Sequence, residues 1–319
     1  EVRCVGSGGK VRENMDKAGD SANAMAAKLY LARTALQALR KAAHEAIETV
    51  AELDKAATTL AIVTGGRSGE AYDLIAQYNE LAKQLGATTV QISDAATSWL
   101  RQGKTTAETA ELIEQSMILS KVAMVDSATA TKNLTSAMRG YGMEVKDVAS
   151  IVDKLSALDS KAAVTASDLA VAMSQTASSA KIGGVSMDRL LGYLTAVQEV
   201  TQRSPETIGQ AFKTIFARMG NIKLGNFLSD DGEDLSDVET ILKHYGIALR
   251  DLNGDFKAVT TTLDNLFPVW EEFKTIDKRA IAQAFAGTRQ QENFLVLMEN
   301  YGKAIEYAGV AAESAGNSM

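Results

Sequence analysis

The longest hydrophobic pattern in the chain lies within its first 64 residues. Apolar or small side chains recur there at alternating spacings of four and three residues, which is the heptad repeat of a coiled-coil helix. The seam consists of Met25, Leu29, Ala32, Leu36, Leu39, Ala43, Ala46, Val50, Leu53, Ala57 and Leu60. Its flanks are also mostly small or apolar, at Ala35, Ala42, Ile47, Thr49 and Ala56. The pattern therefore predicts one long helix with a wide apolar face.

Such a face is buried either against its own domain or against another copy of the chain, and the sequence leaves both open. A wide exposed apolar face is costly for a soluble monomer, so we expect this one to be covered in some way. The hypothesis of self-association rests on the large seam residues, which are Met25, Leu29, Leu36, Leu39, Val50, Leu53 and Leu60.

Beyond Gly65 the pattern changes to shorter amphipathic helices, most of which begin at a residue that can cap the free amides of the first turn. Thr105 with Glu108 has the spacing of a capping box, and Thr165 with Asp168 repeats it. Other starts are expected at Asp126 or Ser127, at Lys146, at Ser186 and at Ser204-Pro205, and breaks at Gly140, Gly142, Gly183 and Gly184. Later helices are expected over 258–273 with a bend at Pro268, over 277–285 and over 289–307.

The fold class follows from these elements. With two prolines and 6% aromatic residues, the chain is predicted to be all-α, with a long N-terminal heptad helix before a multi-helix module. Asn253-Gly254 allows one short β-hairpin near 247–257. We expect four parts. Residues 1–13 form a leader that is flexible or derived from an expression vector, and residues 14–64 form the coiled-coil-like helix. Residues 65–225 form a helical module, and residues 226–319 form a helical part that contains the hairpin.

Two loop-to-helix segments, at 142–148 and 184–190, resemble each other weakly and indicate two similar helical units. The chain starts at Glu1 with no initiator methionine, so we take it to be a piece of something longer.

Charge and composition exclude several classes of function. The chain has 33 basic and 40 acidic residues, a net charge of −7 spread along its length, which argues against sequence-specific binding of nucleic acid. No apolar run has the 18 to 20 residues, roughly, of a membrane span. The single cysteine, Cys4, cannot form an internal disulfide, and His44 and His244 are 200 positions apart, which argues against a zinc site. Neither histidine lies in the sequence context of a known nucleophile.

Two glycine-rich segments superficially resemble phosphate-binding loops. Residues 65–69 follow an apolar stretch, but they lack both the Gly-Lys-Ser/Thr ending and three correctly spaced glycines. Residues 6–10 lack the first glycine and the hydroxyl residue that follows the lysine. We therefore interpret Gly65 as a helix stop and hinge.

The densest acidic cluster comprises Asp230, Asp231, Glu233, Asp234, Asp237 and Glu239. Close to it, Asp251, Asn253 and Asp255 have the spacing of the first three ligands of a calcium loop. However, Phe256 and Thr262 occupy the places where that loop needs glycine and glutamate. A solvated loop is the preferred interpretation, and a weak divalent site over 230–255 stays open. We assign no catalytic, cofactor-binding or metal-binding residue.

Residues 95–225 resemble the conserved core region of phage tail tape measure proteins. The segments that carry the resemblance, in order, are 112–123, 126–138, Gly142 with 152–156, 165–170, 184–186 and 205–218, with an echo of a later hairpin of that family at 246–254. Each segment alone is a soft helical pattern, so the specificity comes from their order and spacing. The segment 65–225 would then be the tape measure core module.

The resemblance implies a structural protein that lies in the lumen of the tail tube or at the tail tip, sets tail length and is ejected ahead of the DNA. It implies as partners the chain itself, as a trimer or hexamer, tail tube protein, tail tip or baseplate proteins, tail assembly chaperones, and the host envelope on ejection. It implies no cofactor. It also implies that the protein is located in the virion and, during assembly, in the host cytoplasm. The alternatives are a generic helical coiled-coil adaptor and, third, a lytic tail-associated enzyme.

Overall fold

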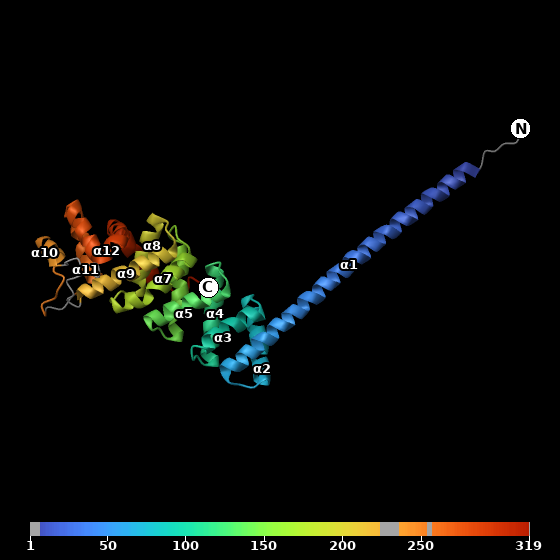
Figure 1. The fold of residues 1–319 in the computed structure, drawn as a ribbon, viewed down its shortest axis with the longest axis horizontal. Helices are drawn as coiled ribbons and strands as arrows, with labels where there is room; N and C mark the ends of the chain where they lie inside the picture. Colours follow the sequence, from blue (N-terminus) through green and yellow to red (C-terminus); the bar gives the residue numbers. More distant parts are fainter. Residues whose placement is uncertain (1–6, 224–235, 254–256, 319) are drawn as a thin grey trace. The chain divides into compact units, whose positions relative to one another are not determined.

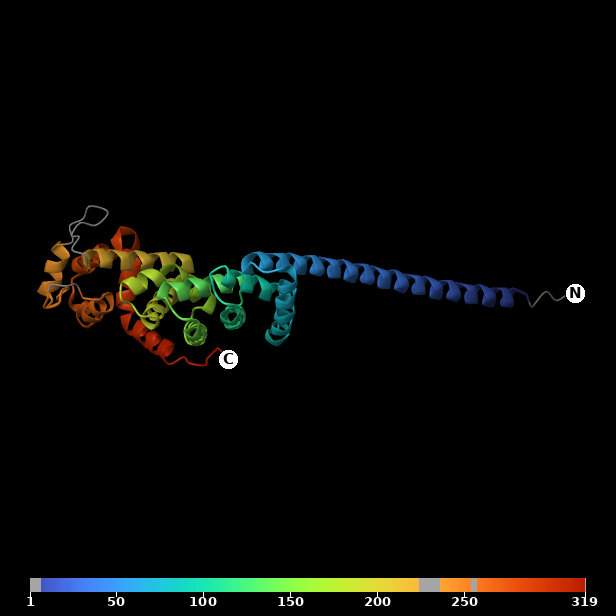
Figure 2. The same ribbon diagram turned by 90° about the horizontal axis from the view of Figure 1, so that it is seen from below.

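The computed structural model describes residues 7–223, 236–253 and 257–318. Every regular element in these ranges is a helix, which confirms the all-α prediction (Figures 1 and 2). The chain forms two compact units, Glu1–Ile75 and Ala76–Met319.

The first unit is dominated by one helix, α1 (Ser7–Thr64), which is continuous over 58 residues (Figure 1). It begins inside the segment 1–13 that the sequence assigned to a leader. It ends at Gly65, whose φ of +65° is the left-handed conformation that glycine adopts without strain. The next helix, α2 (Ser68–Leu85), starts in this unit, where the Tyr72 hydroxyl donates a hydrogen bond to the Asp54 carboxylate of α1.

The second unit contains the remaining elements. In chain order they are α3 (Thr89–Leu100), α4 (Thr106–Val122), α5 (Ser127–Tyr141), the 3₁₀ helix η1 (Val145–Asp147), α6 (Ala149–Asp159), α7 (Ala166–Ile182), α8 (Met187–Thr201), α9 (Pro205–Lys223), α10 (Ser236–His244), α11 (Val259–Leu266), the 3₁₀ helix η2 (Phe267–Glu272), α12 (Thr275–Glu299) and α13 (Tyr301–Ala312).

Helices two apart along the chain lie side by side in this unit. One row runs through α3, α5, α7 and α9, each packed on the next, and α12 continues it beside α9 (Figure 2). Helix α4 contacts α5 and α6, and α13 packs on both α6 and α8. The weak recurrence between residues 142–148 and 184–190 thus falls at two loops, one leading into η1 and α6 and the other into α8, and both α6 and α8 pack on α13.

Two helix crossings depend on the absence of a side chain. Gly192 of α8 lies so close to α13 that a Cβ atom there would overlap the carbonyl oxygen of Ala304. At Gly209 of α9, a Cβ would lie 2.8 Å from the carbonyl oxygen of Ala172 in α7. The backbones of these helices therefore approach more closely than any larger residue allows.

Most predicted helix starts are confirmed. Thr105 and Glu108 form a complete capping box: the Glu108 N–H donates to the Thr105 hydroxyl at 3.3 Å, and the Thr105 N–H donates to the Glu108 carboxylate at 2.8 Å. Asp126 and Ser186 also cap their helices. Thr165 accepts from the Asp168 N–H, but the reciprocal bond is not formed, because the Asp168 side chain is one methylene shorter than glutamate.

The C-terminal helices differ from the prediction in two places. The expected helix over 258–273 is α11 followed by a 3₁₀ helix that contains Pro268. The expected helix over 289–307 is interrupted at Asn300, whose φ of −112° separates α12 from α13. An uncapped boundary of this kind has no strong sequence signal. The break before residue 289 is confirmed by the non-helical Gly287.

The predicted hairpin near 247–257 falls partly on residues 254–256, which lie outside the described ranges. In its described part, the Lys257 N–H donates to the Leu249 carbonyl at 2.8 Å and Arg250 forms an isolated bridge. No regular strand forms in those residues.

Candidate functional site

Most of the predicted seam on α1 is open to solvent. The side chains of Met25, Leu29, Leu36, Leu39 and Val50 are between 53% and 70% exposed. These five residues were placed on one face by their spacing, and the continuous helix keeps them there. An apolar row of this length on a surface marks a place where another molecule can bind.

The C-terminal end of the seam behaves differently. Leu60 is fully buried and Ala57 is almost so, whereas Leu53 is half-buried. The seam thus divides after Val50 into an exposed part and a part that the chain itself covers. The sequence pattern is the same in both parts, so periodicity could not have located this division.

The flanks of the seam follow the same division. Ala35, Ala42, Ile47 and Thr49 are exposed, whereas Ala56 is buried. With small residues on one flank, the backbone of a partner helix can come close to α1. The exposed face can therefore bind another helix, but it carries no group that performs chemistry.

The two histidines give no catalytic arrangement. His44 is exposed on α1 and faces Glu48 one turn later, with 3.2 Å between the imidazole Nε2 and the carboxylate. His244 ends α10 and is exposed, with its ring edge-on to Tyr245. In the described ranges, His44 thus faces a carboxylate and His244 an aromatic ring.

Neither glycine-rich segment forms a phosphate loop in the described residues. Gly65 is the left-handed end of α1, as its interpretation as a helix stop predicted. Residues 7–10 of the other segment are already helical in α1. They form the first turn of this helix, and they lack the first glycine and the hydroxyl residue that a Walker loop requires.

The acidic candidates are only partly described. Asp230, Asp231, Glu233 and Asp234 lie outside the described ranges, as does Asp255. Asp251 accepts a hydrogen bond from the Asn253 N–H at 2.9 Å, which is a local turn. Glu239 forms ion pairs with Lys243 and Arg250. Within the described part of the chain, no three carboxylate, histidine or cysteine groups come together as a metal site would require.

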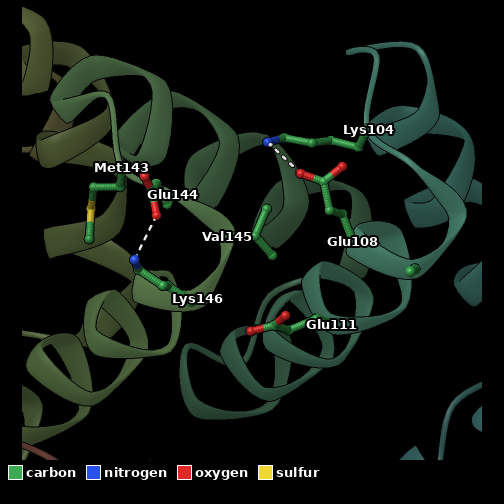
Figure 3. A pocket seen from close by; sticks show the side chains of 8 residues that line it. Lys104, Glu108, Glu111, Met143, Glu144, Val145 and Lys146 are labelled. Carbon is green, nitrogen blue, oxygen red and sulfur yellow. Dashed lines mark hydrogen bonds and ion pairs between the residues drawn. The ribbon is translucent and has the colours of Figure 1, made fainter.

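A cleft in the second unit was not anticipated from the sequence. It has a volume of about 560 Å³ and lies between the start of α4 and the segment around η1 (Figure 3). Its lining residues are Lys104, Ala107, Glu108, Glu111, Met143, Glu144, Val145 and Lys146. The residues come from segments about 40 positions apart, and only the capping box marked one edge of the cleft.

Four of the charged side chains in this cleft form two ion pairs, one in each wall. Lys104 pairs with Glu108 at 3.5 Å, and Lys146 pairs with Glu144 at 2.7 Å (Figure 3). Hydrogen bonds from the Thr105 backbone and hydroxyl lower the pKa of Glu108 below its ordinary value, so this carboxylate stays ionised. The arrangement is that of a largely paired polar surface, and we assign no chemical role to it.

Comparison with known proteins identifies the family. The profile of the phage-related minor tail protein family matches residues 79–287, which are 209 of the 319 residues. No solved structure matches the chain. Among the described helices, none combines the length and apolar character needed to cross a bilayer. The match covers most of the second unit and well over half of the chain, and the chain therefore belongs to the phage-related minor tail protein family.

Proposed function

We propose that this chain is part of a tail tape measure protein, which lies in the lumen of the tail tube and sets its length during assembly. Membership of the minor tail protein family indicates a structural role in the tail of a phage particle and contacts with other tail components. The single observation that carries the finer proposal is α1, a continuous helix of 58 residues. At 1.5 Å per residue it measures about 87 Å, so residue number translates directly into length.

In this proposal the parts of the chain have different tasks. Residues 14–64 act as a rod, whereas 65–225 and 226–319 form compact helical parts that add less reach per residue. A folded module spans only its own diameter, which grows roughly as the 0.38 power of residue number. The proposed partners are tail tube protein, tail tip or baseplate proteins and tail assembly chaperones. Ejection ahead of the DNA, with contact to the host envelope, belongs to the same proposal.

Deletions within the full gene test the ruler directly. Removing residues 29–49, three heptads, keeps the seam in register and is expected to shorten the tail by about 32 Å for 21 helical residues. Removing residues 105–216 is expected to shorten it little or to block assembly, because those helices bury one another. Electron microscopy of the mutant particles measures tail length. Tails of unchanged length after both deletions would contradict the ruler function.

We also propose that the chain self-associates through the exposed seam, and the tape measure role implies three or six copies in the assembled tail. Self-association is supported by the exposure of Met25, Leu29, Leu36, Leu39 and Val50, which a partner would bury. The double variant Leu36→Asp with Leu39→Asp should lower the oligomer mass in analytical ultracentrifugation without unfolding the second unit. Gln37→Asp with Lys41→Asp, on the other side of the helix, is the matched control and should keep the mass. An unchanged mass in the seam variant would show that the seam is not an interface.

The second candidate function is a generic helical adaptor, which the exposed seam also supports. An adaptor would bind its partner helix outside the tail, and its deletions would leave tail length unchanged. We propose no enzymatic activity, and a lytic role predicts peptidoglycan cleavage by the purified chain, which we expect to be absent.

A further inference from the structure

The seam on α1 has a symmetrical order of large and small residues. Its midpoint lies between Ala43 and Ala46, and the next seam residues outward on the two sides are Leu39 and Val50. Leu36 and Leu53 follow, and beyond them the order continues with Ala32 and Ala57, then Leu29 and Leu60. Two copies of α1 that run in opposite directions about this midpoint would place large residues against large ones and alanine against alanine. An antiparallel pair is therefore as complementary in shape as a parallel pair in register, in which each seam residue faces its own copy, and charge has to decide between them.

The charges on α1 are segregated about the same midpoint. Residues 33–41 contain three basic side chains, Arg33, Arg40 and Lys41, and no acidic one. Residues 45–54 contain four acidic side chains, Glu45, Glu48, Glu52 and Asp54, and no basic one. A parallel pair in register would place like charges side by side, whereas an antiparallel pair places the basic segment of each copy against the acidic segment of the other. Charge of this kind selects helix orientation.

One specific ion pair follows from the heptad positions. The seam alternates between two heptad positions, and Ala32 and Leu53 both occupy the position called d. In an antiparallel pair, the residues that follow the d positions face one another across the interface. Arg33 of each copy therefore faces Asp54 of the other copy, which gives two such pairs. Both side chains are exposed, and Arg33 has no ion-pair partner in the part of the chain that the structure describes. Asp54 accepts from Tyr72 through one carboxylate oxygen, which leaves its second oxygen for a guanidinium. A parallel pair in register has no opposite charges at the flanking positions.

We propose that two copies of the free chain pair through antiparallel α1 helices, with the twofold axis between Ala43 and Ala46. The contact runs from Arg33 to Asp54, and the two helices cross at an angle that separates them beyond it, because Ala57 and Leu60 are already covered within the chain. These 22 residues span about 33 Å. The alanines at the centre allow the two backbones to approach closely. The pairing concerns the free protein and does not depend on the tape measure role.

Cysteine cross-linking tests the orientation. In a Cys4→Ser background, Leu39→Cys and Val50→Cys are made as separate, differently tagged chains, alone and mixed, and oxidised. The antiparallel pair brings positions 39 and 50 of different copies into one layer, within the range of a disulfide. The mixture is therefore expected to yield about tenfold more cross-linked dimer than either chain alone, and this dimer should carry both tags. In an antiparallel pair of identical variants, the two Cα atoms at position 39, or at position 50, lie too far apart for a disulfide. Equal or better cross-linking of Leu39→Cys alone would overturn the antiparallel orientation, and so would the absence of any dimer.

Charge reversal tests the ion pair. Arg33→Asp and Asp54→Arg should each weaken dimerisation about tenfold, which corresponds to about 1.4 kcal/mol, and the double variant should restore it. Lys41→Asp makes the same change in net charge as Arg33→Asp at a position that does not face the partner helix, so it should weaken dimerisation clearly less than Arg33→Asp. Asp54→Arg also loses the hydrogen bond from Tyr72, and the double variant loses it too. Restored dimerisation in the double variant would therefore be due to the ion pair. Failure of the double variant to restore association would contradict the pairing. Tail length is measured separately, so the ruler proposal stands or falls independently.

Discussion

Helices α1 and α8 carry similar leucine patterns with opposite outcomes. In α8, Leu190, Leu191 and Leu194 are completely buried, because α7, α9, α12 and α13 of the same chain pack around this helix. In α1, Leu36 and Leu39 are exposed. The comparison shows that an apolar stripe on a helix predicts burial of that face but does not identify the neighbour that buries it. For α8 the neighbours include α13, more than 100 residues away in the same chain, and for α1 we infer that the neighbour is another copy.

The largest effect is expected from shortening one leucine in each helix. Leu194→Ala in α8 should lower the free energy of unfolding by about 4 kcal/mol, because it leaves a cavity among packed side chains. Leu39→Ala in α1 removes an exposed side chain and should change it by less than about 0.5 kcal/mol at concentrations where the chain is monomeric. Urea unfolding followed by circular dichroism measures both. Equal losses would mean that the two faces are buried alike.

A second pair of variants compares Gly192, which lies in the α8–α13 contact, with Gly309 of α13, which has open space around it. Gly192→Ala inserts a methyl group into the carbonyl oxygen of Ala304 and should cost about 3 kcal/mol. Gly309→Ala in α13 meets nothing within 4 Å and should stabilise the protein by up to about 1 kcal/mol through helix propensity. The shifts of the thermal midpoint should therefore have opposite signs. A neutral Gly192→Ala would show that the crossing can separate without cost.

Asp153 of α6 tests how the C-terminal tail is held. Its buried carboxylate accepts from the N–H groups of Gly316 at 2.9 Å and Ser318 at 3.0 Å, and from the Ser318 hydroxyl. Asp153→Asn should cost about 2 kcal/mol at pH 7, because an amide nitrogen would face an N–H donor. Hydrogen exchange of residues 314–318 should rise in the variant, and exchange at α8 should serve as the internal control.

The same carboxylate predicts a pH dependence. Burial alone would raise the pKa of Asp153, but the hydrogen bonds from Ser318 and Gly316 outweigh it and lower the pKa below its ordinary value of about 3.9. With the folded pKa below the unfolded one, the stabilisation is complete above about pH 5 and is lost as the pH falls through the folded pKa. The difference between wild type and Asp153→Asn should therefore shrink below about pH 4. A difference that stays constant down to pH 2.5, roughly, would contradict the assignment.

The smallest effect concerns a repeated helix end. Met124 and Gly184 occupy the same left-handed turn, with φ of 51° and 73°, after α4 and α7. Met124→Gly should stabilise the protein by about 1 kcal/mol, because methionine is strained in this conformation and its side chain is exposed. Gly184→Ala should lower the free energy of unfolding by about the same amount. Thermal unfolding of the two variants gives the signs, and a loss in both would show that the Met124 side chain makes a contact of its own.

Local signals explain why the helices could be located so well. Thr105, Asp126 and Ser186 cap helices through bonds to amides two or three residues away, and Gly65 and Gly184 end helices by their own conformation. The boundary at Asn300 was missed because it carries no cap, and only packing places it there. Long-range contacts such as that of Asp153 with Ser318, 165 positions away, leave no local signal.

The sequence by itself determined the all-α class, the long helix, its apolar seam and most helix ends, because each depends on interactions within about two turns. Only the tertiary structure decided which apolar faces are covered. It buried Leu60 and left Leu39 in solvent although both occupy the same heptad position, and it formed the cleft between Lys104 and Lys146 from separate segments. The physical reason is that burial depends on which distant helix supplies the opposing surface, and a periodic pattern contains no record of that partner.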